Sequence, residues 1–463
     1  MRQTNIALAL LTAAVLAACG GNGSTGGDQT LKNKFSAQVT FGDSLADVGT
    51  YKVGTVAALG GGQFTVNGNN TAKDPVLTGK NWSELMAAQF GLAAPCPAVT
   101  GLDGNAEGFL VPVVAKAGCF GYAMGGARVT NPVGPGNKLA PGSNIGALTY
   151  PVTTQIANHL AVSGGKFSGT EVVFVMAGGN DALMLLGQLS AAATDAGQTA
   201  GAAAGQQAFA SSLISQLAAG ATNPATAAQA IGAAMQTEAA RTGSTPTTVI
   251  GAAVAAAAAE PGNSQVGSQT VYGPMVVKAQ ADATAAGNTA GAKAGADYLT
   301  AHGPEQVAAM STAGTELAAL VKTQIVAKGA SFVVVNNLPD VSISPSSKAQ
   351  PASTQALIKA MANAFNASLK AGIAGEAKVL YVDLFTLSVD QSTNPGPYGL
   401  TNTTTPVCAT NPLGGSSLGC NGSNLIAGDV GHYMFADSVH PTPFEHSLVA
   451  RYIAEQMIVK GWL

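Results

Sequence analysis

Apolar stretches with two different periods alternate along most of the chain. Four short runs, β-branched or aromatic and bounded by turn-forming residues, predict buried strands at Gln38–Asp43, Glu171–Ala177, Ser331–Asn336 and Val379–Leu384. Between them, apolar residues at helical spacing predict helices, as at Ala356–Leu369. Strands that alternate with helices predict an α/β fold with a parallel sheet covered on both faces.

Residues 183–303 interrupt this alternation, because Ala, Gly, Thr and Gln dominate them and no strand pattern is present. A structureless loop of this length would be unusual. Since Ala favours helix and Gly disfavours it, the composition predicts several short helices, with breaks at Gly or at prolines such as Pro224 and Pro261. We interpret the segment as an Ala/Gly-rich helical insertion. The sequence leaves open whether it caps the active site or forms a partly disordered appendage.

The first 18 residues have the pattern of a signal segment. One Arg near the start precedes an apolar run, Ile6–Ala18, that is too short to cross roughly 30 Å of hydrocarbon. The run ends in Leu-Ala-Ala before Cys19 and resembles a bacterial lipoprotein signal, which implies cleavage before Cys19 and lipidation of that residue. Ordinary secretory cleavage is the alternative. Residues 19–36 are expected to be a flexible tether.

Four further cysteines remain in a chain expected to leave the reducing cytosol: Cys96, Cys119, Cys408 and Cys420. Three pairings are possible. We favour the two local ones, Cys96 with Cys119 and Cys408 with Cys420, which close short loops rich in Gly and Pro. Metal binding by these thiols is disfavoured because no C-x-x-C pair is present.

The charge balance argues against nucleic acid as a partner. Lys and Arg number 21 against 24 Asp and Glu, which gives a net charge of −3 and no basic stripe to neutralise phosphates.

Candidate catalytic side chains lie at the two ends of the chain. Ser44 follows the first predicted strand, at the edge where open α/β sheets bind ligands. A Ser hydroxyl becomes a nucleophile when a neutral imidazole accepts its proton and a carboxylate orients that imidazole. Asp437 and His440 offer both groups within one turn. A metal site formed by His440 with His432 and His446 is the less favoured alternative, since their spacing matches no common zinc pattern.

Two further blocks could stabilise negative charge. Gly126 lies in Tyr122–Arg128, a segment that supplies small residues where backbone N–H groups can approach a ligand. Asn180 follows the second predicted strand and offers a side-chain amide. Preorganised donors of this kind stabilise an oxyanion, each typically worth about 10²- to 10³-fold in rate.

The order of these blocks resembles the GDSL, or SGNH, hydrolase family: Gly-Asp-Ser-Leu, Gly-Gly-Ala, Gly-Asn-Asp and Asp-x-x-His-Pro. The resemblance covers about 37–182 and 304–463, the expected hydrolase domain. It implies that Ser44 is the nucleophile, His440 the base and Asp437 its orienter, with oxyanion donors from Ser44, Gly126 and Asn180. Two departures are Gly121, where many members have Asn, and the insertion.

The resemblance also implies a flavodoxin-like three-layer α/β/α sandwich with a parallel sheet of about five strands. It implies hydrolysis of small-molecule or lipid esters without a metal or organic cofactor. Acyl transfer by the same triad and a non-catalytic binding lipoprotein are the alternatives. The expected location is the bacterial cell envelope, with the protein either lipid-anchored, as at the outer membrane, or secreted.

Overall fold

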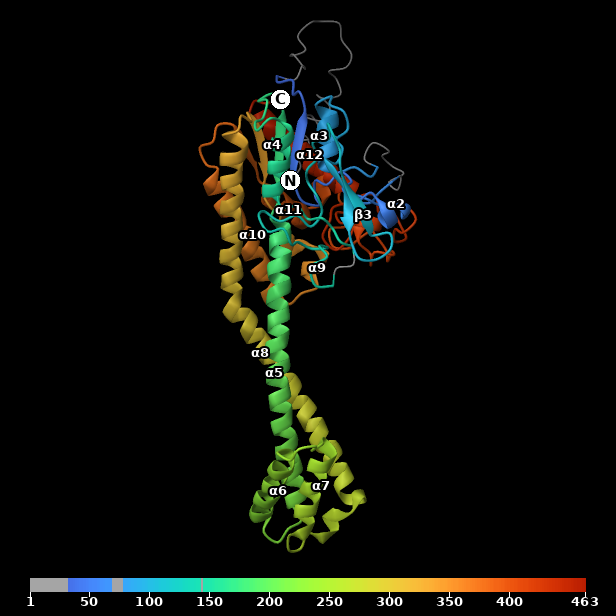
Figure 1. Ribbon diagram of the computed structural model, residues 1–463, viewed down its shortest axis with the longest axis vertical. Coiled ribbons are helices and arrows are strands. Elements are labelled where there is room, and N and C mark those ends of the chain that lie inside the picture. The colour runs from blue at the N-terminus through green and yellow to red at the C-terminus, as the bar shows by residue number, and fades with distance from the viewer. Residues whose placement is uncertain (1–31, 69–77, 143–144) are drawn as a thin grey trace, which may run out of the picture. The chain divides into compact units, whose positions relative to one another are not determined.

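The computed structural model describes residues 32–68, 78–142 and 145–463 (Figure 1). The expected signal segment, Cys19 and most of the expected tether lie outside the described residues. The chain divides into two compact units. The α/β unit holds the described residues up to Gly178 together with Thr315–Gln350 and Ser368–Leu463, and the helical unit holds Gly179–Gly314 and Pro351–Ala367.

A parallel four-stranded sheet forms the centre of the α/β unit. Its strands stand in the order β1 (Gln38–Gly42), β4 (Val172–Met176), β5 (Phe332–Asn336) and β6 (Val379–Val382). These are the four runs that the apolar pattern predicts. Almost all of their residues are buried, as the continuous apolar runs require in a sheet covered on both faces.

The expected fifth strand is absent from this sheet in the described part of the chain. Beside β1, the chain forms only an isolated parallel bridge between Thr40 and Gly121. The Thr40 N–H donates to the Phe120 carbonyl and the Tyr122 N–H donates to the Thr40 carbonyl. The Met124 N–H also donates to the Gly42 carbonyl, and the chain then turns at Gly125.

Helices lie on both faces of the sheet. On one face the Trp82 ring of α3 (Trp82–Gln89) contacts Phe174 of β4 at a centroid distance of 5.2 Å, and α12 (Pro443–Val459) shares the same hydrophobic cluster. On the other face His159 of α4 (Val152–Val162) contacts Phe41 of β1 at 5.8 Å. The unit is therefore a layered α/β fold.

Shorter elements complete the α/β unit. They are α2 (Gly54–Ala58), the antiparallel pair β2 (Val99–Asp103) and β3 (Leu110–Ala115), η4 (Val341–Ile343), α9 (Pro345–Lys348), α11 (Leu384–Thr393), η5 (Gly396–Tyr398) and η6 (Ser417–Gly419).

The helical unit is formed mainly by α5 (Gly179–Ala218), α6 (Pro224–Ala239), α7 (Pro246–Ala259), η2 (Ser264–Gly267) and most of α8 (Gln269–Leu320), which continues into η3 (Val321–Val326) (Figure 1). The first part of α10 (Ala352–Gly372) also belongs to it.

The expectation of several short helices is wrong for α5 and α8, which run for 40 and 52 residues through their glycines. Pro224 does begin a helix, with Asn223 as its cap. No helix in the described part of the chain is long and apolar enough to cross a membrane.

Glycines at every fourth position bring α5 and α8 close together. A Cβ added at Gly201 would lie 2.8 Å from the Gly287 carbonyl oxygen, and one at Gly197 would lie 2.9 Å from that of Gly291. Both distances are too short for a real contact with backbone. The spacing therefore removes side chains from the line where the two helices meet, and the residues concerned are Gly197, Gly201, Gly205, Gly287, Gly291 and Gly295.

We expect Gly201→Ala to lower the free energy of unfolding of the helical unit by about 1–3 kcal/mol, because the new methyl group forces two backbones apart. Gly187→Ala is the matched control, since it lies in the same helix with no atom within 4 Å of the added Cβ. Helix propensity alone should make this control about 0.5–1 kcal/mol more stable. Denaturant unfolding followed by circular dichroism measures both, and equal shifts of one sign would contradict a close helix contact.

Candidate active site

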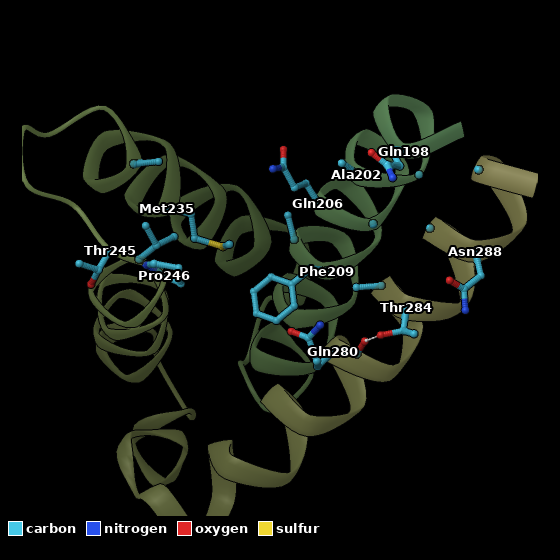
Figure 2. Close-up of a pocket in the computed structure, with 18 of the residues that line it drawn as sticks. Gln198, Ala202, Gln206, Phe209, Met235, Thr245, Pro246, Gln280, Thr284 and Asn288 are labelled. Atoms are coloured by element: carbon cyan, nitrogen blue, oxygen red, sulfur yellow. Dashed lines mark hydrogen bonds between the residues drawn. The ribbon is translucent and has the colours of Figure 1, made fainter. Parts of the chain in front are cut away.

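The described residues form cavities of very different character in the two units. A groove of about 1100 Å³ in the helical unit is lined by α5, α6, α7 and α8 (Figure 2). Figure 2 shows Phe209 and the amides of Gln206 and Gln280 in its wall. Among the described residues that line it, none is acidic, basic, His or Cys. The groove therefore offers contacts but no group that transfers protons at neutral pH.

The α/β unit instead brings three reactive side chains into one hydrogen-bonded series. The Ser44 Oγ lies 2.9 Å from His440 Nε2, although 396 positions separate the two residues. On the other side of the ring, His440 Nδ1 lies 2.9 Å from Asp437 Oδ2. An Nδ1–H that donates to the carboxylate leaves Nε2 free to accept the Ser44 proton.

The Asp437 carboxylate is buried and accepts several hydrogen bonds. Its Oδ1 accepts the backbone N–H groups of Val439 at 2.9 Å and His440 at 2.8 Å, and its Oδ2 accepts that of Ser417 at 2.7 Å. Burial by itself raises the pKa of Asp437, but the charge and hydrogen bond of His440 and the N–H donors outweigh it and hold the pKa well below its usual range. The group is thus an anion beside the imidazole.

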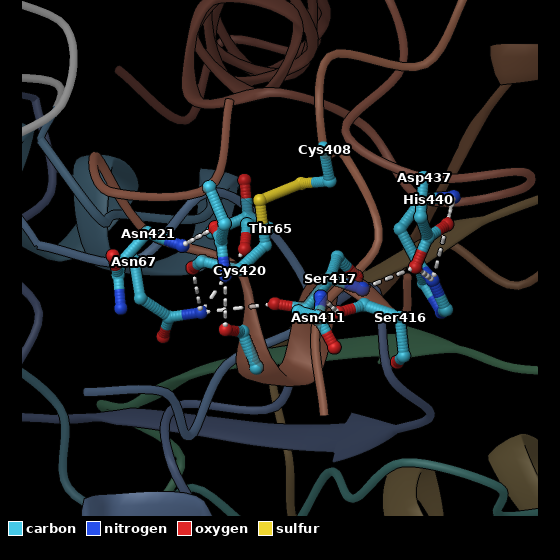
Figure 3. The surroundings of a disulfide bond; sticks show 12 residues. Thr65, Asn67, Cys408, Asn411, Ser416, Ser417, Cys420, Asn421, Asp437 and His440 are labelled. Carbon is cyan, nitrogen blue, oxygen red and sulfur yellow. Dashed lines mark hydrogen bonds and ion pairs between the residues drawn. A yellow bond between two sulfur atoms is a disulfide. The ribbon is translucent and has the colours of Figure 1, made fainter. Parts of the chain in front are cut away.

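A disulfide closes the loop that supplies the Ser417 donor. Cys408 is joined to Cys420, and Cys96 to Cys119, which are the two local pairings that the sequence favours. Figure 3 shows Ser417 between the disulfide and the Asp437 side chain. The Asn67 amide donates to the carbonyls of Ser417 and Cys420 and thereby holds the same loop.

The strand end that carries Ser44 is held by its backbone. A Cβ at Gly42 would lie 2.1 Å from the Met176 carbonyl oxygen, so only glycine fits where β1 passes β4. The buried Gln155 amide clamps the same residue, because its Oε1 accepts the Gly42 N–H and its Nε2 donates to the Gly42 carbonyl, both at 2.8 Å. Ser44 follows in a turn closed by an Ala46 N–H to Asp43 carbonyl bond.

The backbone N–H groups of Ser44 and Gly126 have no hydrogen-bond acceptor within the described part of the chain. Gly126 has a φ of 79°, and a Cβ there would lie 2.3 Å from the Pro135 carbonyl oxygen, so the turn requires glycine.

The neighbouring residue, Gly125, donates to the buried Asp47 carboxylate, which also accepts from Gly49 and Thr50. Burial raises the pKa of Asp47 to about 6, and these donors only partly offset it.

The other predicted residues are placed as follows. Asn180 is buried in the first turn of α5, four positions beyond the end of β4.

The histidines of the alternative metal site have separate surroundings. His432 Nδ1 lies 2.9 Å from the Gly399 carbonyl oxygen, and its ring stacks on Phe444. His446 is fully buried, and burial, with the nearby His440 as a smaller cause, lowers its pKa to about 3. No group of metal-ligating side chains forms among the described residues.

Sequence reasoning did not find the residues that support this site. Asp47 lies three positions after Ser44, and Ser417 lies inside a predicted disulfide loop. Both are therefore close in sequence to features that the sequence predicts. Gln155 gives no signal at all, because its only distinction is burial against a strand end far away in sequence.

Comparison with known proteins gives partial matches. Residues 294–453, about a third of the chain, match the model of the family described as GDSL-like lipase/acylhydrolase. This segment includes Asp437 and His440 but not Ser44.

Three proteins of Arabidopsis thaliana are similar to short segments of the chain. The GDSL esterase/lipase At2g40250 is 33% identical over 81 residues, 18% of this chain and 22% of the relative. The GDSL esterase/lipase At1g58430 is 28% identical over 87 residues, 19% and 23% of the two chains, and the GDSL esterase/lipase At1g06990 is 30% identical over 79 residues, 17% and 22%. The alignments span less than a quarter of each relative's length.

One substitution isolates the contribution of the Ser417 N–H. Ser417 begins the short helix η6 after the extended Ser416, a position where proline fits the backbone. We expect Ser417→Pro to slow labelling of Ser44 by a fluorophosphonate about tenfold, because Asp437 loses a charge-assisted hydrogen bond. Ser417→Ala keeps the N–H and removes an Oγ that has no partner in the described part of the chain, so it should label like the unchanged protein. Equal labelling rates for the two variants would contradict a role for this contact.

Glu445 provides a test by pH. It is fully buried in the first turn of α12, where Gln391 Nε2 donates to it at 3.2 Å, and burial raises its pKa to about 8. Between the unfolded value of about 4.3 and pH 8, the folded chain retains a proton that the unfolded chain has lost. Stability must therefore fall as pH rises through this window, by at most about 1.4 kcal/mol per pH unit.

Glu445→Gln removes this penalty and keeps an acceptor for Gln391. We expect its stability advantage over the unchanged protein to be small near pH 4.5 and to grow up to pH 8 in denaturant unfolding. Glu455→Gln, an exposed position on the same helix, is the control. An advantage that stays constant with pH would show that Glu445 does not titrate in this range.

Proposed function

We propose that the chain is a serine hydrolase that cleaves carboxylic esters through a covalent acyl-enzyme at Ser44. The observation that carries the proposal is the series Ser44 Oγ, His440 and Asp437, with 2.9 Å at each step. The partial matches to GDSL esterases and lipases support ester hydrolysis in general. The specific substrate and the roles of the three residues belong to the proposal.

In the first half of the reaction, His440 Nε2 accepts the Ser44 proton while Oγ attacks the ester carbonyl carbon. The resulting imidazolium lies against the Asp437 carboxylate, which stabilises its charge. When the tetrahedral intermediate collapses, His440 returns the proton to the leaving alkoxide, and the acyl group stays on Ser44. In the second half, water attacks this acyl-enzyme with the same base and releases the acid.

The tetrahedral intermediate carries an oxyanion that needs hydrogen-bond donors. The backbone N–H groups of Ser44 and Gly126 are suited to it, because neither is used within the described part of the chain. The Asn180 side chain is the proposed third donor. Asp47 supports this arrangement indirectly, since its carboxylate ties the Gly125–Gly126 turn to the turn that follows Ser44.

We propose short-chain or lipid esters as substrates and the bacterial cell envelope as the location, with Cys19 as the lipid anchor. The location rests on the sequence of the signal segment alone.

The test is to replace the nucleophile and the base. We expect Ser44→Ala and His440→Ala each to lower kcat for p-nitrophenyl acetate at least about 10³-fold, and the double variant to be no slower, because the residues act as one unit. Ser438→Ala is a matched control for Ser44→Ala, since Ser438 is exposed within the Asp437–His440 turn. A fluorophosphonate should label Ser44 in the control and nothing in Ser44→Ala. Full activity in Ser44→Ala would end the proposal.

A further inference from the structure

A small, mostly apolar cavity lies in the α/β unit next to the catalytic residues. Its volume is about 90 Å³, and most of its lining side chains are apolar. Leu45, Val439 and Pro441 are among them, and they are the direct chain neighbours of Ser44 and His440. The wall of the cavity is therefore continuous with the backbone that carries the nucleophile and the base.

The burial of the lining residues distinguishes a mouth from a floor. Leu45, Val439 and Ile343 are partly exposed. Leu384, Leu387 and Trp82 are buried within the hydrophobic cluster between the sheet and α12, with exposures of 3%, 7% and 1%. The partly exposed part of the lining thus includes the chain neighbours of the proposed catalytic residues, and the closed side lies in the core.

The lining also includes polar side chains, among them the buried carboxyl of Asp340, whose Oδ1 accepts hydrogen bonds from the Ser342 N–H and O–H. Glu445 retains its proton because burial raises its pKa to about 8, and His446 is neutral because its pKa is lowered. No Lys or Arg is among the described residues that line the cavity, so an anionic group would lose its hydration there without an opposite charge, whereas an apolar chain has little hydration to lose.

We propose that this cavity binds the acyl chain of the substrate and limits the enzyme to esters of short acids such as butanoate. The proposal rests on the proposed function, because it assigns a substrate class to the same site. The size follows from volume. An apolar cavity of about 150 Å³ holds one benzene, so 90 Å³ holds roughly three or four carbon atoms. An acetyl group leaves most of the cavity empty, and an octanoyl chain exceeds it.

The first measurement is kcat/KM of the full chain for the p-nitrophenyl esters of acetate, butanoate, hexanoate and octanoate. Each methylene that becomes buried is worth about 0.8 kcal/mol, or fourfold in rate. We expect a rise of about 15-fold from acetate to butanoate and no further rise to octanoate. An increase of fourfold per methylene that continues through octanoate would overturn the proposal.

Two variants change the cavity from opposite sides. Ile343→Phe fills the mouth and should bring the ratio of butanoate to acetate close to one, with hydrolysis of acetate retained. Leu387→Ala deepens the floor and should raise the ratio of hexanoate to butanoate roughly tenfold. Val389→Phe and Val389→Ala are the matched controls, because Val389 lies on α11 with Leu387 but does not line the cavity. Neither control should change the ratios.

The outcomes separate this proposal from the one on which it rests. If acetate is cleaved in a Ser44-dependent way but folded Ile343→Phe has the same ratios as Val389→Phe, the acyl pocket is rejected and the esterase stands. If no ester is cleaved and a fluorophosphonate fails to label Ser44, both are rejected. Should Leu387→Ala fail to fold, Ile343→Phe decides, because its site is partly exposed and tolerates added volume better than the core does.

Discussion

The buried carboxylate of Asp437 is the group around which the candidate active site is organised. A buried anion is costly unless hydrogen bonds and a nearby positive charge compensate it. Here the compensation comes from the turn that also carries His440 and from the disulfide-closed loop that carries Ser417. The Asp437 carboxylate accepts hydrogen bonds from both segments. The orientation of the imidazole and the packing of the Ser417 loop therefore depend on each other. A loop far from Ser44 in sequence thereby becomes part of the site.

The strand end that precedes Ser44 is held by neutral groups instead. Gln155 forms two hydrogen bonds with the Gly42 backbone, and at the same residue β1 lies too close to β4 for any side chain. A strand end held in this way cannot shift toward or away from the imidazole without breaking both hydrogen bonds to the Gln155 side chain. Asp47 then connects the turn after Ser44 to the glycine turn, whose Gly126 N–H has no acceptor among the described residues. Ser44 and His440, each held by these separate contacts, face each other at 2.9 Å.

The central sheet was predictable from sequence because buried parallel strands are continuous apolar runs, a pattern visible without knowledge of the fold. Ser44, Asp437 and His440 could be found because each stands at a strand end or in a turn with a distinctive order of residue types. The supporting residues could not. Gln155 and Ser417 act through one amide and one backbone N–H, and neither function requires a recognisable pattern. The expected fifth strand came from resemblance, and in its place the chain forms a single bridge at Gly121.

The prediction of several short helices in the helical unit was wrong because it considered the helix propensity of glycine and not its packing. In an isolated helix each glycine costs about 1 kcal/mol relative to Ala, so the composition of a Gly-rich segment predicts several short helices. That cost is offset when the missing side chain lets two long helices approach until their backbones touch, as Gly197 and Gly201 do against α8. The distinguishing feature is spacing. Glycines four positions apart fall on one face of a helix, and a second set with the same spacing, Gly287–Gly295, supplies the partner. Such a repeat favours a continuous, closely paired helix, whereas isolated glycines such as Gly243 favour a turn.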